Sequence, residues 1–290
     1  MPDRQDIFRC GKGHIQIMGI SHITSTSNTA VKNAVALRQK KYRDEQGLIV
    51  FEGMKMLKEA VSAGLRIKSV FVLEDVYEEN ASFLDSVSAD DIYTVNNAVA
   101  EKISDWKTPQ GIASIAEKPK YCIDNVLNAE NSFVVILDGV ADPGNIGTII
   151  RTSEAAAVSA VITTAGSADC FQPKALRASM GSIFRIPVFE NSEKCDIIYK
   201  VQSNGFSLVS TSLSGKNIAS GFARKEKTAV VFGNEGAGIS KEFVEKSDML
   251  VKLPMSGKVE SLNVAVSAGI IMYMLNMPGD TDNTVTAGCR

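Results

Sequence analysis

Hydrophobic positions along the first third of the chain alternate between short apolar runs and helical spacing. Runs typical of buried strands are found at 48–51, 67–73, 92–95 and 112–115. Between them, apolar residues return every three or four positions, the spacing of an amphipathic helix. Helices are expected near 38–43, 54–61, 81–87 and 98–103. This alternation predicts an α/β domain within residues 22–118.

A second series of apolar runs begins after a polar connection at 117–132. Strands are expected at 133–137, 160–163, 184–189, 206–211, 229–232 and 249–253. Helices fill the intervals, and the last is expected at 261–275. The pattern predicts a second α/β domain over residues 119–290. Residues 1–21 lack such periodicity and are expected to form a flexible extension.

Composition narrows the function classes without selecting one. The 290 residues carry a net charge of −2, which argues against indiscriminate nucleic-acid binding but allows a local basic patch. The longest apolar stretch, 262–275, contains Asn263 and Ser267 and is too short to span a membrane. Five scattered cysteines and two histidines near the N-terminus predict neither a metal site nor a Ser-His-Asp triad. With no secretory signal, a cytoplasmic location is expected.

Three loops with polar or glycine residues each follow a predicted strand of the second domain. The first, 138–151, contains a Pro-Gly-Asn turn with Asn145 and leads to Arg151; the second is the glycine-rich 233–238. The third, 253–263, ends in Ser261 and Asn263. Carboxyl ends of strands in an α/β sheet commonly form a ligand site, so the three loops predict a pocket. Each loop alone is equally compatible with an ordinary connection, and the absence of GxGxxG disfavours a small-molecule enzyme of Rossmann type.

These segments carry a specific resemblance. Residues 138–151, 232–238 and 253–264 resemble, in order and spacing, the three motifs of the SpoU (TrmH-type) RNA 2′-O-ribose methyltransferases of the SPOUT superfamily. Residues 171–182 resemble the segment between the motifs. Residues 40–43, Glu52-Gly53 and Pro109-Gln110-Gly111 resemble the ribosomal-protein-like substrate domain of the family. The similarity covers about residues 22–277.

The resemblance implies a fold and an activity. It implies a C-terminal methyltransferase domain with a trefoil knot, an N-terminal ribosomal-protein-like α/β domain that binds RNA, and a homodimer. The implied cofactor is S-adenosylmethionine and the implied reaction is methylation of a ribose 2′-hydroxyl, without a metal. Ribosomal RNA is the favoured substrate. A transfer RNA methyltransferase and an RNA-binding protein that has lost catalysis are the alternatives.

The resemblance also assigns residues by position. Catalytic roles are implied for Asn145, Arg151, Glu235, Ser261 and Asn263. Cofactor contacts are implied for Thr211, Gly233, Asn234, Gly238, Leu253, Met255, Ser261 and Leu262. RNA-backbone contacts are expected from Arg38, Lys40, Lys41 and Arg43, for which a solvated helix face is the alternative. An arginine is a poor base, because its pKa lies above about 12, so a clamping or charge-stabilising role is preferred for Arg151.

Overall fold

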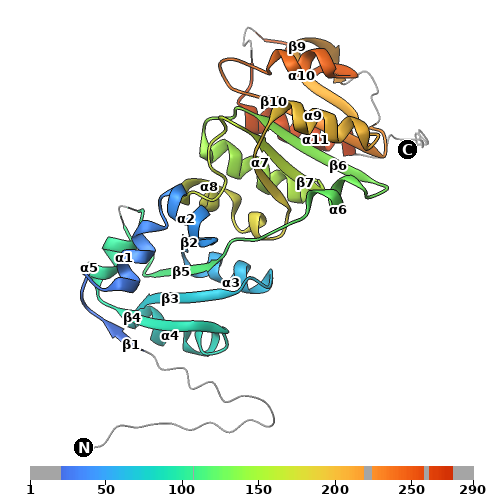
Figure 1. Ribbon diagram of the computed structural model, residues 1–290. Coiled ribbons are helices and arrows are strands. Elements are labelled where there is room, and N and C mark those ends of the chain that lie inside the picture. The colour runs from blue at the N-terminus through green and yellow to red at the C-terminus, as the bar shows by residue number, and fades with distance from the viewer. Residues whose placement is uncertain (1–20, 107, 219–223, 258–260, 277–290) are drawn as a thin grey trace, which may run out of the picture.

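The protein consists of two α/β domains, each built from one β-sheet and its own helices (Figure 1). The computed structural model describes residues 21–106, 108–218, 224–257 and 261–276. The predicted extension over 1–21, with Cys10 and His14, lies almost wholly outside the described residues. None of the helices in the described ranges is long and apolar enough to cross a bilayer.

The N-terminal domain is built on a mixed five-stranded sheet of order β1-β4-β3-β5-β2. Its strands are β1 (Ser21–Ile23), β2 (Leu48–Glu52), β3 (Ile67–Leu73), β4 (Ala89–Val95) and β5 (Ile112–Glu117). Its helices are α1 (Thr29–Ala36), α2 (Lys40–Gln46), α3 (Met54–Ser62), α4 (Glu74–Leu84) and α5 (Asn97–Ile103). Buried residues of α1 and α5 share one hydrophobic cluster, and those of α3 and α4 belong to another.

The C-terminal domain is built on a six-stranded, fully parallel sheet of order β11-β9-β10-β6-β7-β8. Its strands are β6 (Ser132–Asp138), β7 (Ala160–Thr164), β8 (Val188–Ser192), β9 (Ser207–Asn217), β10 (Lys227–Gly233) and β11 (Met249–Lys252). Its helices are α6 (Ile123–Leu127), α7 (Pro143–Ala155), α8 (Pro173–Ser179), α9 (Lys194–Ser203), α10 (Lys241–Lys246) and α11 (Val264–Asn276). Every residue of β6 is buried, as expected for a parallel strand covered on both faces.

The predicted α/β class is confirmed, and several predicted elements are corrected. The strand expected at 184–189 is present but starts later: residues 182–184 form a 3₁₀ turn, and β8 begins only after Pro187. Proline cannot donate to a ladder and disfavours helix for the residue before it, so it marks the start of the strand. The polar connection contains a short helix, α6. The final helix begins at Val264 rather than 261, because Asn263 caps it.

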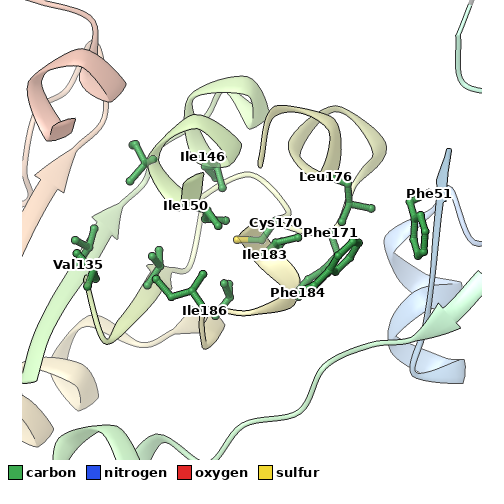
Figure 2. Packing of buried hydrophobic residues seen from close by; sticks show 14 of the residues in the cluster. Phe51, Val135, Ile146, Ile150, Cys170, Phe171, Leu176, Ile183, Phe184 and Ile186 are labelled. Atoms are coloured by element: carbon green, nitrogen blue, oxygen red, sulfur yellow. The ribbon is translucent and has the colours of Figure 1, made fainter. Parts of the chain in front are cut away.

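The two domains pack directly against each other. Phe51 of β2 lies 5.2 Å, centroid to centroid, from Phe184 in the C-terminal domain, and Figure 2 shows Phe51 facing Phe184, Phe171 and Leu176. One cluster of buried residues extends through both domains. Ion pairs cross the same boundary, among them Lys118–Glu190 at 2.6 Å and Arg185–Glu59.

Arg43 belongs to this boundary, which corrects one prediction. Its side chain is only 2% exposed. It donates to the carbonyl of Leu37 at 2.8 Å and pairs with Asp169 of the C-terminal domain. A buried guanidinium held in this way cannot reach RNA, so the expected RNA contact of Arg43 is wrong. The side chain instead fastens α2 to the neighbouring domain.

Helices α7 and α8 approach closely at a glycine. A Cβ added to Gly147 would lie 2.3 Å from the carbonyl oxygen of Ala175 and 2.6 Å from the Cβ of Ala178. Neither backbone can yield without separating the helices. The close approach holds α8 beside the first turns of α7, next to the predicted pocket.

We expect Gly147→Ala to destabilise the protein by about 1–3 kcal/mol, because overpacking costs more than the gain of about 1 kcal/mol in helix propensity. Gly269→Ala is the matched control: it is also a helix-interior glycine, but its added Cβ would meet only a methyl of Thr152 at 3.4 Å. Its free energy of unfolding should be unchanged or slightly raised. Urea denaturation measures both. Equal stabilities of the two variants would contradict the packing argument.

Candidate active site at the carboxyl ends of the parallel strands

A buried aspartate at the end of β6 anchors the site. Asp138 Oδ2 accepts from the backbone N–H of Ser240 at 2.8 Å, and Oδ1 accepts from the hydroxyl of Thr164 at 3.1 Å. Lys194 Nζ lies 3.1 Å from Oδ1. Burial raises the pKa of Asp138, but the hydrogen bonds from Ser240 and Lys194 outweigh burial and hold that pKa below its usual value. The carboxylate therefore joins the ends of β6 and β7 to the segment after β10 and to the start of α9.

The glycine-rich loop after β10 closes on itself. Asn234 and Gly238 exchange backbone hydrogen bonds of 3.0 and 2.9 Å. Asn234 Oδ1 also accepts from the N–H groups of Gly236 and Ala237, and its Nδ2 donates to the carbonyl of Gly139 at 2.8 Å. A Cβ on Gly233 would lie 2.4–2.5 Å from the backbone of Gly238 and Ile239. The loop thus requires glycine at 233, and the Asn234 side chain builds the loop and ties it to the turn after β6.

Three of the predicted catalytic residues form one hydrogen-bonded chain. Asn145 Nδ2 donates to Glu235 Oε1 at 2.7 Å. Asn263 Nδ2 donates to Asn145 Oδ1 at 3.0 Å, while Asn263 Oδ1 caps α11 by accepting from the N–H of Ala265 at 2.9 Å. The chain joins the loops that follow β6, β10 and β11. The expected convergence of the three loops is therefore present.

The other two predicted catalytic residues stand apart from this chain. Arg151 lies six residues beyond Asn145 on α7, about 9 Å along the axis and on a different face of the helix. Its side chain is exposed, and within the described ranges it makes no hydrogen bond or ion pair. Ser261 is exposed two residues before Asn263. Both are free to meet a ligand, but the structure does not link Arg151 to Asn145.

Some of the positions expected to contact the cofactor are apolar. Met255 and Leu262 are exposed, as is Leu213 on β9, whereas Leu253 is half-buried against the core. Thr211 donates its hydroxyl to the carbonyl of Val231 at 3.0 Å, which leaves its side chain engaged with β10. Within the described residues no group of three or more His, Cys, Asp or Glu is arranged to hold a metal ion.

Comparison with known proteins places the chain in a family. Over 256 residues it is 31% identical to the Bacillus subtilis 23S rRNA (guanosine(2553)-2′-O)-methyltransferase RlmP, covering 88% of this chain and 99% of that protein. The chain belongs to the SpoU rRNA methylase family. The family's model matches residues 132–273, and a model of an MRM3-like substrate binding domain matches residues 28–114.

Solved structures of similar proteins agree with this SpoU assignment. The AdoMet-bound rRNA methyltransferase from Sinorhizobium meliloti is 32% identical, with a TM-score of 0.78 over 88% of this chain and 97% of that chain. The SpoU methyltransferase AviRb from Streptomyces viridochromogenes, in complex with AdoMet, is 26% identical. Its TM-score is 0.77, over 85% of this chain and 96% of that chain. The likeness therefore spans both domains.

The basic run lies within the substrate binding domain of this SpoU protein. Arg38 pairs with Asp105 at 2.9 Å and Lys40 with Asp44 at 3.3 Å. Lys41 projects into solvent, and its 3.9 Å pair with Glu45 is too exposed to hold it. Tyr42 packs against the cluster of α1 and α5. Of the four basic residues, Lys41 remains the most accessible to an RNA backbone.

We expect Asp138→Asn to lower the free energy of unfolding by about 2 kcal/mol at pH 7, because it weakens charge-assisted hydrogen bonds in a buried setting. The pKa of Asp138 is lowered in the folded state, so its contribution is present above the unfolded value of about 3.9. That contribution is lost as pH falls through the lowered folded pKa. Denaturation at a series of pH values should therefore show the difference from wild type shrinking below about pH 4.

Asp196→Asn is the control for this measurement. Asp196 is exposed on α9, and its substitution should stay within about 0.5 kcal/mol of wild type at every pH. A gap between Asp138→Asn and wild type that does not vary with pH would show that shape, rather than ionisation, sets the contribution of Asp138.

Proposed function

We propose that the protein transfers the methyl group of S-adenosylmethionine to a ribose 2′-hydroxyl of ribosomal RNA. The observation that carries the proposal is the hydrogen-bonded chain Glu235–Asn145–Asn263, which joins the three motif loops at one edge of the sheet. The proposal is supported by the activity in the name of RlmP and by the AdoMet bound in the two similar structures, because all three proteins align with both domains.

The residues around the loops fit S-adenosylmethionine. The cofactor presents a flat adenine ring and a charged methionine end, and it supplies an electrophilic methyl group when bound. Exposed Leu213, Met255 and Leu262 offer an apolar surface suited to the ring. The bend at Gly233 lets two backbone segments approach within a distance that a side chain would fill, so backbone groups can line the pocket closely.

Arg151 is the residue we propose to act on the substrate. A guanidinium is a poor proton acceptor, so Arg151 does not serve as the base and the proton of the 2′-hydroxyl is released to solvent water. It stabilises the alkoxide that develops at the 2′-oxygen and holds an adjacent phosphate with its planar fork. The Asn145 chain keeps the loops in position, since methyl transfer depends chiefly on in-line alignment of oxygen and methyl carbon. Ser261 lines the approach to that point.

Ribosomal RNA is preferred over transfer RNA because residues 28–114 match a substrate binding domain and RlmP carries a 23S rRNA activity. Loss of catalysis is disfavoured, since every polar position of the three motifs is present and three of them are joined. A ribosomal substrate favours the cytoplasm as the location of the protein.

We also propose that the protein is a homodimer joined through α11. Val266, Ile270 and Tyr273 are exposed at i, i+4 and i+7 and form an apolar stripe on this helix. Such a stripe is costly in water and typical of a protein interface. Helix α11 packs on α7, the helix that carries Arg151, so a partner bound to the stripe would lie next to the helix pair that bears this residue.

The family's trefoil knot belongs to the same proposal. Strand β11 lies at the edge of the sheet beyond β9, whereas α11 packs on α7 and β10 near the middle. The described ends of β11 and α11 therefore lie at the edge and near the middle of the sheet, a placement that agrees with the proposed knot. Gly215, where an added Cβ would lie 2.6 Å from the backbone of Val251, accommodates the tight pairing of β9 with β11.

We expect Arg151→Ala to lower kcat by about 100- to 1,000-fold, the loss typical when a group that stabilises transition-state charge is removed. Arg151→Lys should retain part of the rate, because charge remains while the fork is lost. Transfer of labelled methyl from S-adenosylmethionine to unmethylated rRNA measures both, and calorimetry should show unchanged cofactor affinity. Wild-type turnover by Arg151→Ala would remove the proposed role of this residue.

We expect Ile270→Asp to convert the dimer to a monomer, because the substitution places a charge in the middle of the apolar stripe. Size-exclusion chromatography with light scattering measures the mass. Tyr199→Asp is the control, since Tyr199 on α9 is 73% exposed and lies outside the stripe. If Ile270→Asp keeps the mass of wild type, or wild type is itself monomeric, the proposed interface is wrong.

A further inference from the structure

A hollow opens between the two domains, away from the motif loops of the candidate active site. The N-terminal domain supplies Arg38, Glu52 and Trp106 to its walls, and the C-terminal domain supplies Pro173, Leu176 and Arg177 of α8. Buried apolar residues of β2 form part of the lining.

Trp106 gives this hollow an exposed aromatic surface. It is the only tryptophan of the 290 residues, and it is 42% exposed. The guanidinium of Arg177 lies 4.9 Å from the centroid of the indole. A large aromatic side chain held partly open to water beside a planar cation provides a stacking platform.

Glu52 fixes the segment that carries Trp106. Its carboxylate accepts from the hydroxyl of Ser104 at 2.8 Å and from the backbone N–H of Gln110 at 2.7 Å. Ser104 in turn accepts from the backbone N–H of Trp106 at 3.0 Å. Gly53 has a φ of +103°, and an added Cβ would lie 2.3 Å from the Gln110 side chain. The Glu52-Gly53 and Pro-Gln-Gly motifs thus preorganise the platform.

The charges in the hollow balance one another. Asp105 accepts from Arg38 at 2.9 Å and from Arg177 at 3.0 Å, so both guanidinium groups are already paired. Together with Glu52, the two arginines and Asp105 sum to zero. A phosphate would have to displace Asp105 from its cations, whereas a neutral planar ring would not. Each oxygen of Asp105 can still accept a further N–H, such as those on the edges of nucleobases.

We propose that this hollow binds an unpaired nucleobase of the RNA substrate, stacked on Trp106. The inference rests on the proposed function, which supplies the RNA. Proteins recognise RNA chiefly through unpaired bases stacked on aromatic side chains and guanidinium planes. Lys174, next to Pro173 on α8, pairs at 2.6 Å with Asp142, the residue that caps α7. A base held here is therefore connected, through α8, to the first turn of α7, which carries Asn145.

Trp106 allows a direct test, because all tryptophan fluorescence comes from this position. Titration with 23S rRNA transcribed in vitro, and hence unmethylated, should quench the fluorescence of wild type, whereas S-adenosylmethionine alone and inorganic phosphate should not. Filter binding, which needs no tryptophan, should show the Kd for this RNA raised by about 5- to 100-fold in Trp106→Ala, the loss expected for one stacked base. Trp106→Phe should recover most of the affinity.

Matched measurements separate stacking from misfolding and from backbone contact. Trp106→Ala should bind S-adenosylmethionine like wild type, and at saturating RNA its kcat should stay within about twofold of wild type, because the base contributes binding rather than chemistry. Its Kd ratio to wild type should not vary with salt, since stacking releases no counterions. Tyr199→Ala, another exposed aromatic, should leave the Kd for RNA unchanged.

The outcomes distinguish this inference from the proposed function. Methylation by Trp106→Ala with the KM of wild type, or RNA binding without quenching, would overturn the nucleobase site and leave the methyltransferase intact. Quenching by phosphate would also overturn it in favour of an anion site. Conversely, quenching by rRNA in a protein that transfers no methyl group would support the nucleobase site while the proposed function fails.

Discussion

The candidate site depends on the hydrogen bonds made by the side-chain amide of Asn145. It donates to Glu235 and accepts from Asn263, so one side chain joins the loops after β6, β10 and β11. Among side chains of this size, only an amide can donate to a carboxylate and accept from another amide in the same plane. Asp142 sets this geometry by capping α7 through the N–H of Asn145 itself.

The parallel sheet makes this junction feasible. Strands β6 and β10 are neighbours, and their register places Asp138 opposite Gly233, so both loops leave the sheet at the same level. Asp138 accepts a hydrogen bond from the backbone N–H of Ser240, in the segment after β10. In the opposite direction, the side chain of Asn234 donates to the carbonyl of Gly139, in the turn after β6. Two sets of hydrogen bonds therefore stabilise the site: those of the buried Asp138 carboxylate at the strand ends, and the exposed chain Glu235–Asn145–Asn263.

The periodicity of the sequence predicted those features that local sequence determines, namely the positions of strands and of the loops that follow them. The strand expected at 67–73 matches β3, and the three polar loops follow strands whose carboxyl ends do converge. Prediction from the sequence failed where a residue far away in the chain determines the position of a side chain. Arg43 reads as one member of a basic run, yet Asp169, 126 positions away, draws it into the domain boundary. Likewise, nothing near Glu52 in the sequence indicates that it fixes the segment carrying Trp106.

Contacts across the domain boundary fix the two α/β domains relative to each other. Removing either partner of the buried Arg43–Asp169 pair would leave an uncompensated charge, and Phe51 against Phe184 fills the adjacent core. These contacts oppose sliding of one domain over the other. Helix α8 contacts Trp106 through Arg177 and the α7 cap through Lys174, so it connects the proposed nucleobase site to the start of α7. Under the two proposals, this connection would fix the spacing between a bound base and the reactive ribose, and that spacing would select the nucleotide that is methylated.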